Sequence, residues 1–131
     1  MKQNLELKLH LSEESYPAML TDKDRLFQIL CVFMDNAIQH SKNNSLIEIE
    51  VIATEKNIAF SVADHGQGIS DEDKQYIFDR FYSGDKSHTN KSNFGLGLSI
   101  AKELTQMLNG TITINDTAGG GATFTVKFPL K

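Results

Sequence analysis

The chain has 131 residues, of which 40% are hydrophobic and 23% charged, and its formal net charge is −4. This length favours a single domain, residues 1–131, with a substantial core, and the composition is that of an ordinary globular protein. The acidic balance gives no reason to expect a nucleic-acid surface. No apolar run approaches the length of a membrane span, so we expect no contact between this chain and a membrane.

The N-terminal part predicts a strand followed by a long helix. Leucines alternate with polar residues over residues 5–11, which is the period-2 pattern of a half-buried strand. The short run "AMLT" at 18–21 is a candidate for another strand. Asp22 offers an N-cap for the helix, which ends before the polar residues 41–45. The inward stripe of this helix follows the i, i+3, i+4, i+7 spacing and comprises Leu26, Ile29, Leu30, Phe33, Met34 and Ala37.

The middle of the chain predicts a hairpin and then a polar loop. Residues 45–54 and 57–64 are two apolar-rich runs joined by two charged residues, which favours an antiparallel hairpin. A short helix is predicted over residues 71–77. Almost no apolar side chain occurs over residues 82–93, and a loop of that length in a compact domain is usually functional or disordered.

The C-terminal part predicts a second long helix and a second hairpin. The helix covers residues 95–108, and Asn109-Gly110 closes it as a C-cap. Strands at "TITIND" and "ATFTVKF" flank the glycines at 119–121. Because strands and helices are mixed without strict alternation, we predict an α/β (α+β) two-layer sandwich. Its sheet is expected to be mixed and mostly antiparallel, with the helices on one face.

Two glycine-rich segments invite a nucleotide hypothesis, yet neither matches a familiar phosphate motif. The chain has no G-x-x-x-x-G-K-[ST] run, which a P-loop requires. The dinucleotide fingerprint G-x-G-x-x-G fails twice, because Asp71 and Ile100 occupy the positions of its third glycine. Neither glycine pair is specific on its own.

The ordered set of motifs is far more specific. It consists of "DNA" at 35–37, "DHGQGI" at 64–69, "FDRFY" at 78–82, "GLGL" at 95–98 and "GGGATF" at 119–124. In this order and spacing, the sequence resembles the ATP-binding catalytic domain of bacterial sensor histidine kinases, whose Bergerat-type fold is shared with DNA gyrase, a heat-shock chaperone and mismatch-repair ATPases. The resemblance covers residues 5–130.

The resemblance implies that Asp64 reads adenine. A carboxylate only accepts hydrogen bonds, so it suits the exocyclic amine of adenine and leaves the carbonyl of guanine unsatisfied. Gly66 and Gly68 are expected to let the backbone pass close to the purine and to adopt positive φ. On the residues alone, a strand-to-helix turn with Asp64 as a local cap is the simpler interpretation.

Asn36 resembles the asparagine that reaches the metal and the phosphates in this family, and we expect it to be the catalytic and metal-binding residue. Mg²⁺ prefers oxygen ligands, so an amide carbonyl is suitable. The ordinary alternative is a hydrogen bond from this polar residue to a neighbouring loop.

The phosphates are expected at the start of the second long helix. Gly95 and Gly97 resemble the segment where a lid meets this helix, whose free N–H groups and dipole attract phosphate. Leu96 and Leu98 are expected to anchor the helix. The remaining residues that the resemblance assigns to ATP binding are the aromatic hinge and the lid cation together with three further family positions: Phe78, Phe81, Lys86, Ile69, Arg80 and Thr123.

Three positions depart from the family pattern. Val32 stands where most sensor kinases carry a second asparagine and where the hydrolysing relatives carry a glutamate that activates water. Valine can neither bind a metal nor act as a general base, so we expect no independent ATP hydrolysis. Gln39 and Ser83 replace residues that are usually cationic, and both changes remove positive charge from near the phosphates.

The sequence therefore predicts the ATP- and Mg²⁺-dependent catalytic domain of a two-component sensor histidine kinase. The phosphate acceptor would be a histidine on a separate dimerisation domain, because none of the four histidines here lies in a motif like H-E-x-[KR]-[TNS]-P. Alone, the chain is not expected to autophosphorylate. We expect a cytoplasmic fragment of a larger, membrane-anchored receptor that passes phosphate to a response regulator. The alternatives are a degenerate nucleotide-binding module that no longer transfers phosphate and an ATP-driven clamp.

Overall fold

The computed structural model describes residues 5–11, 21–42, 44–79 and 97–130. The elements in these ranges are β1 (Glu6–Leu11), α1 (Lys23–His40), β2 (Leu46–Ala53), β3 (Asn57–Ala63), α2 (Asp71–Lys74), α3 (Gly97–Met107), β4 (Thr111–Asp116) and β5 (Ala122–Pro129). The predicted loop at 82–93 and most of the candidate strand at 18–21 lie outside the described residues. No helix of the described residues is long and apolar enough to cross a membrane.

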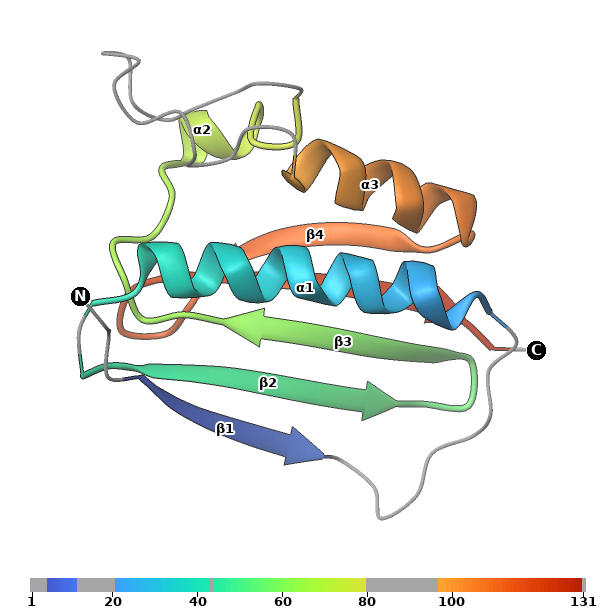
Figure 1. The fold of residues 1–131 in the computed structure, drawn as a ribbon, viewed down its shortest axis with the longest axis horizontal. Coiled ribbons are helices and arrows are strands. Elements are labelled where there is room, and N and C mark those ends of the chain that lie inside the picture. The colour runs from blue at the N-terminus through green and yellow to red at the C-terminus, as the bar shows by residue number, and fades with distance from the viewer. Residues whose placement is uncertain (1–4, 12–20, 43, 80–96, 131) are drawn as a thin grey trace.

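The five strands form one mixed sheet in the order β1-β2-β3-β5-β4. β1 runs parallel to β2, while the β2–β3, β3–β5 and β4–β5 pairs are antiparallel. Figure 1 shows α1 and α3 on the same side of this sheet, where the two helices also contact each other. The predicted two-layer sandwich is confirmed.

The core lies between α1, α3 and the sheet. Ile29, Phe33 and Ala37 of α1 are almost fully buried, as their spacing predicts, and the ring of Phe33 stacks on Phe124 of β5 with centroids 5.4 Å apart. Asp22 caps α1 by accepting hydrogen bonds from two backbone N–H groups in the first turn. The helix therefore begins where the sequence predicts, with its apolar stripe facing β3 and β5.

The prediction that β1 is half-buried is wrong for its leucines. Leu7, Leu9 and Leu11 are 58%, 60% and 54% exposed. The register places Leu7 beside Ile47 of β2, on the same face as the core. In Figure 1, β1 is an edge strand and lies beyond the edge of α1, so its leucines share the apolar face of the sheet without a helix of the described residues above them.

Two element ends differ from the sequence expectation or refine it. The helix predicted over residues 71–77 is confined to α2, Asp71–Lys74, and the following residues form turns. At the end of α3, Asn109 takes the left-handed conformation with φ of 63°, and the N–H of Gly110 bonds to the carbonyl of Thr105 at 2.9 Å. This is the helix-ending geometry expected of the Asn-Gly pair.

The face of the sheet away from the helices is polar, and we call it the outer face. Period-2 alternation along β2, β3 and β5 places Glu48, Ser61 and Thr125 on it, opposite the buried Ile47, Val62 and Phe124. Ser61 and Thr125 bond to each other across neighbouring strands, with their hydroxyl oxygens 2.9 Å apart.

Candidate functional site

Asp64 is a buried carboxylate at the end of β3, with 3% of its surface exposed. Its N–H still bonds to the carbonyl of Ala122 at 2.9 Å, so it continues the alternation of β3 and its side chain lies on the helix side. Oδ1 accepts from the backbone N–H of Gly66 at 3.0 Å and of Ala122 at 3.2 Å. Both bonds fall on one oxygen, and Oδ2 takes part in neither. The residue is thus a local cap and a fixed acceptor at the same time.

The glycines around Asp64 bring three backbone segments into close contact. A β-carbon on Gly66 would overlap the carbonyl oxygen of His40 at the end of α1, and one on Gly121 would overlap the carbonyl of Asp64 itself. Gly68 has φ of 79°, as predicted, and its β-carbon would lie 3.3 Å from the carbonyl oxygen of Gly121. Gly66, against expectation, is not among the positive-φ glycines. Its missing side chain lets the segment approach α1.

Asn36 is buried on the inward stripe of α1, with 6% of its surface exposed. Its side-chain Nδ2 has no hydrogen-bond partner among the described residues, so the ordinary alternative, a bond to a described loop, is not seen. Burying an unpaired amide costs about 1–3 kcal/mol, and such a group in a native protein calls for an explanation. A ligand that pairs with the amide supplies one.

The N-terminus of α3 lies beside α1 one turn before Asn36. The helix begins at Gly97, where an added β-carbon would lie 3.5 Å from Cγ1 of Val32. Asn36 is itself one turn before His40, which Gly66 contacts. The C-terminal half of α1 therefore lies next to the unpaired amide of Asn36, the segment around Asp64 and the N-terminus of α3. The first N–H groups of α3 have no hydrogen-bond partner within that helix.

Other predicted site residues have structural surroundings. Leu98 is 1% exposed and sits in the core, as expected of a helix anchor, and Ile69 packs against that core. The ring of Phe78 stands edge-on to Phe124 at 6.4 Å, with Nζ of Lys102 5.9 Å from its centroid. The predicted residues that lie outside the described residues are Arg80, Phe81, Lys86, Gly95 and Leu96.

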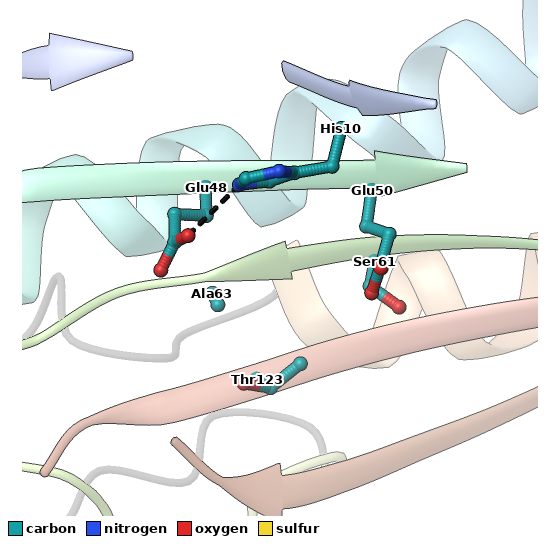
Figure 2. Close-up of a pocket in the computed structure, with 6 residues that line it drawn as sticks. All are labelled: His10, Glu48, Glu50, Ser61, Ala63 and Thr123. Carbon is teal, nitrogen blue, oxygen red and sulfur yellow. Dashed lines mark hydrogen bonds and ion pairs between the residues drawn. The ribbon is translucent and has the colours of Figure 1, made fainter. Parts of the chain in front are cut away.

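Among the predicted site residues that the structure describes, Thr123 lies apart from Asn36 and Asp64. Its hydroxyl lies 2.9 Å from that of Thr117, and its side chain lies on the outer face, because its neighbours Ala122 and Phe124 point into the core. There it lines a pocket of about 270 Å³ with His10, Glu48, Glu50, Ser61 and Ala63 (Figure 2). The sheet separates this pocket from the buried amide of Asn36.

Two backbone groups of the site carry no signal of their own in the sequence. The N–H of Ala122 fixes the Asp64 carboxylate, and the carbonyl of His40 sets the path of the Gly66 segment. Any residue supplies such groups, so only the glycines that make room for them could have indicated the contacts.

The described residues offer a magnesium ion few protein ligands. They contain no group of three or more His, Cys, Asp or Glu side chains that could hold a metal. Mg²⁺ in nucleotide sites commonly keeps several waters and binds one or two protein oxygens together with substrate phosphates. The side-chain oxygen of Asn36 suits that arrangement as a single protein ligand, whereas its unpaired Nδ2 is a donor and would pair with an acceptor such as a phosphate oxygen.

Comparison with known proteins places these features in a family. The sequence profile of the family described as "Histidine kinase-, DNA gyrase B-, and HSP90-like ATPase" matches residues 21–131. The sensor protein CiaH of Streptococcus pneumoniae is 41% identical over 114 residues, which are 86% of this chain and 26% of that protein. This chain therefore spans about a quarter of the length of that curated relative.

Solved structures agree with the sequence relatives. The catalytic domain of histidine kinase ThkA, in a nucleotide-free form, has a TM-score of 0.83 at 25% identity, over 97% of this chain and 81% of that chain. Full-length ShkA in complex with AMPPNP has a TM-score of 0.79 at 28% identity, over 96% of this chain and 26% of that chain. ThkA in complex with the response regulator TrrA shares the fold, with a TM-score of 0.81 at 23% identity, over 97% of this chain and 34% of that chain.

The protein belongs to the histidine kinase-, gyrase- and HSP90-like ATPases, since their profile matches most of the chain. Within that class, its sequence relatives and structural neighbours are sensor histidine kinases, and the chain corresponds to their ATP-binding catalytic domain. No finding on the described residues favours the degenerate alternative or the ATP-driven clamp.

Proposed function

We propose that this domain binds ATP between α1, α3 and the segment that follows β3, and that it transfers the γ-phosphoryl group to a histidine of a separate dimerisation domain. The observation that carries the proposal is the buried carboxylate of Asp64, whose Oδ1 is held by two backbone N–H groups while Oδ2 joins neither bond. Such a carboxylate presents a fixed acceptor to the amine of adenine and disfavours guanine.

The phosphate end of the nucleotide would lie toward Asn36 and the start of α3. Helix N-termini attract phosphate through free N–H groups and the helix dipole, and α3 begins at Gly97 beside Val32 of α1. The unpaired amide of Asn36 gives a second, independent reason for a polar ligand on this side of the sheet. The complex of full-length ShkA with AMPPNP supports an adenine nucleotide as the ligand.

Asn36 is the residue we propose to hold Mg²⁺, through its side-chain oxygen. When bound there with the phosphates, the ion would neutralise charge that develops during phosphoryl transfer. Asn36 would also orient the phosphate chain, and the core packing of Leu98 would keep the N–H groups of α3 in place. Val32 offers no general base for water, so transfer to a histidine is favoured over hydrolysis.

The rest of the proposed ATP site comprises the residues beside α2 and α3. Ile69 and Phe78 pack against the core near the glycine segment, and Gly97 and Leu98 open α3. We further propose Arg80, Phe81, Lys86, Gly95 and Leu96 as contacts from the segment between Phe78 and α3. Because the structure places Thr123 on the outer face, we do not include it in the nucleotide site.

The partners of the whole protein are part of the proposal, since the chain spans about a quarter of its relative CiaH. We propose a dimerisation domain that carries the acceptor histidine, and a response regulator downstream, as the complex of ThkA with TrrA suggests. In a sensor of this kind the domain would work on the cytoplasmic side of a membrane-anchored receptor, where ATP is available.

The proposal is tested by replacing Asp64 with Asn and titrating ATP and GTP by calorimetry, with and without Mg²⁺. The amide oxygen can keep the bonds from Gly66 and Ala122, so the melting temperature should change little. The amide nitrogen would face the amine of adenine, so the free energy of ATP binding should fall by about 1–3 kcal/mol, with a relative gain for GTP. Unchanged ATP affinity in a folded variant would remove Asp64 from the site.

Transfer is tested separately by adding the purified acceptor-histidine domain and MgATP. Formation of acid-labile phosphohistidine on that domain supports the kinase function. Normal ATP binding without any phosphohistidine, under conditions in which the full receptor is active, would contradict it.

A further inference from the structure

Directly behind the proposed adenine site, two histidines from different segments meet at one carboxylate. Nε2 of His65 lies 2.8 Å from Oε1 of Glu48, and Nε2 of His10 lies 2.9 Å from Oε2. His65 follows β3, Glu48 is on β2 and His10 is on β1. Figure 2 shows His10 and Glu48 pointing toward each other across β1 and β2. We call these residues the outer-face triad.

The triad is connected to the nucleotide site through adjacent residues. Asp64 and His65 are neighbours in an extended segment, so their side chains lie on opposite faces of the sheet. Asp64 is buried on the helix side, whereas His65 is 31% exposed on the outer face. Any movement of the His65 backbone therefore displaces the Asp64 carboxylate on the other side.

Backbone contacts hold this segment on two other sides. Gly66 lies against the carbonyl of His40 on α1, and Gly121 lies against the carbonyl of Asp64 from the turn before β5. The side chain of His65 adds the link to β2, on the side that neither glycine contact restrains. Exposed ion pairs contribute little to global stability, but one at this position restrains a local orientation.

The negative charge of the triad is that of Glu48. Hydrogen bonds from His65 and His10, in that order, lower the pKa of Glu48, so its carboxylate stays ionised under mildly acidic conditions. Histidine is the side chain that ordinarily gains a proton between about pH 8 and pH 5. The charged and titratable groups that the alternation places on this face are Glu6, Lys8, His10, Glu48, Glu50, His65 and Lys127.

We propose that His65, held by Glu48, is a positioning residue that fixes the Asp64 carboxylate for adenine, and that a positive charge on this histidine strengthens the restraint. The inference rests on the proposed function, because it assigns Asp64 to adenine. It predicts that nucleotide affinity responds to a histidine that the nucleotide does not touch.

The test compares His65→Ala, His65→Gln and the matched control His10→Ala. All three change one histidine partner of the same carboxylate, but only position 65 adjoins Asp64. The dissociation constant for ATP is measured for each variant at about pH 6 and about pH 8, and it is expressed as a ratio to wild type so that ionisation of the nucleotide cancels. Melting temperatures are measured in parallel.

We expect His65→Ala to weaken ATP binding about three- to tenfold at about pH 6, and less at about pH 8, as loss of a partly exposed charged hydrogen bond implies. His65→Gln keeps an N–H donor for Glu48, so at about pH 8 it should bind ATP almost as tightly as wild type. It should lack the stronger restraint that a charged histidine gives wild type at about pH 6. His10→Ala should lower the melting temperature about as much as His65→Ala, with a smaller loss of affinity.

Equal losses of affinity in His65→Ala and His10→Ala, or a ratio that does not change with pH, would overturn the inference while leaving the proposed function intact. If His65→Ala does not fold, His65→Gln alone decides. Its dissociation constant for ATP, relative to that of wild type, must still be larger at about pH 6 than at about pH 8. Absence of ATP binding by the wild-type protein would overturn the proposed function and the inference with it.

Discussion

At position 36 the protein buries an amide that none of its described neighbours pairs with. A group of this kind lowers the stability of the nucleotide-free protein, because it gives up its hydrogen bonds to water on folding. Because this amide donor is unpaired, it is also available to a ligand. Stability and function therefore make opposite demands on this residue.

This conflict leads to a prediction for Asn36→Leu, which keeps the branched shape of the side chain without its polar atoms. The free energy of unfolding without nucleotide should rise by about 1 kcal/mol, since an unpaired buried amide is removed. The increase in melting temperature that wild type shows on adding MgATP should be greatly reduced. Chemical denaturation and thermal melts measure the two effects, and a variant less stable than wild type would contradict the argument.

Single residues also show what sequence patterns could and could not predict about the site. The alternation of Phe124, Val126 and Phe128 into the core already implies that Thr123 points outward, away from the side of the sheet that holds Asn36 and Asp64. The contact between Gly66 and the carbonyl of His40 could not be foreseen. It depends on how the end of α1 approaches β3, which no local pattern encodes.

At the scale of elements, Leu7 of β1 and Ile47 of β2 can be compared directly. Leu7 is 58% exposed and Ile47 is fully buried, although the two are adjacent in register on the same face of the sheet. We expect Ile47→Ala to cost about 2–5 kcal/mol of unfolding free energy, because it leaves a cavity in the core. Leu7→Ala should cost less than about 1 kcal/mol, because its side chain is already largely hydrated.

Urea denaturation of both variants checks this expectation. Similar losses at the two positions would mean that Leu7 is covered in solution by some part of the protein. The comparison is sensitive because both changes shorten an aliphatic side chain to the same methyl group.

Elements defined by local signals were predicted well. The Asp22 cap, the stripe of α1, the β2–β3 hairpin and the Asn-Gly end of α3 each follow from residues close together in sequence. The burial of β1 was not predicted correctly, because it depends on which strands the helices cover. Periodicity identifies the apolar face of a strand but not whether anything lies above it.

For the molecule as a whole, the outer-face triad makes stability depend on pH. Hydrogen bonds from His65 and His10 lower the pKa of Glu48 from the ordinary 4.5. A carboxyl group whose pKa is lowered in the folded state stabilises the protein above its unfolded pKa, and this contribution is lost as the pH falls through the folded pKa. The partial exposure of the group limits the size of the effect.

Glu48→Gln should therefore be less stable than wild type by about 0.5–1 kcal/mol near neutral pH, with the difference shrinking at acidic pH below the ordinary pKa of glutamate. Denaturation at about pH 7 and at about pH 3 measures it. A difference that stays constant between these conditions would show that packing of the side chain, rather than its charge, matters.

The two-layer sandwich followed from the mixture of predicted strands and helices, and the resemblance of the ordered motifs to one family agreed with it. The strand order could not be derived from local patterns, since β5 inserts between β3 and β4. The register that brings Glu48 to His65, in contrast, belongs to the β2–β3 hairpin. Neither the local patterns nor the resemblance was used to predict a strand order, and elementary periodicity predicted the faces of each element.

The insertion of β5 beside β3 also has a consequence for how quickly the chain reaches its native state. The β2–β3 and β4–β5 hairpins join residues close in sequence, whereas the β3–β5 seam pairs Asn57 with Pro129 and Ala63 with Thr123. Contacts between such distant residues require a large loss of chain entropy before they stabilise the chain, and this slows folding. Formation of the β3–β5 pairing, which ends beside Asp64, is thus the folding step that joins the two hairpins into one sheet.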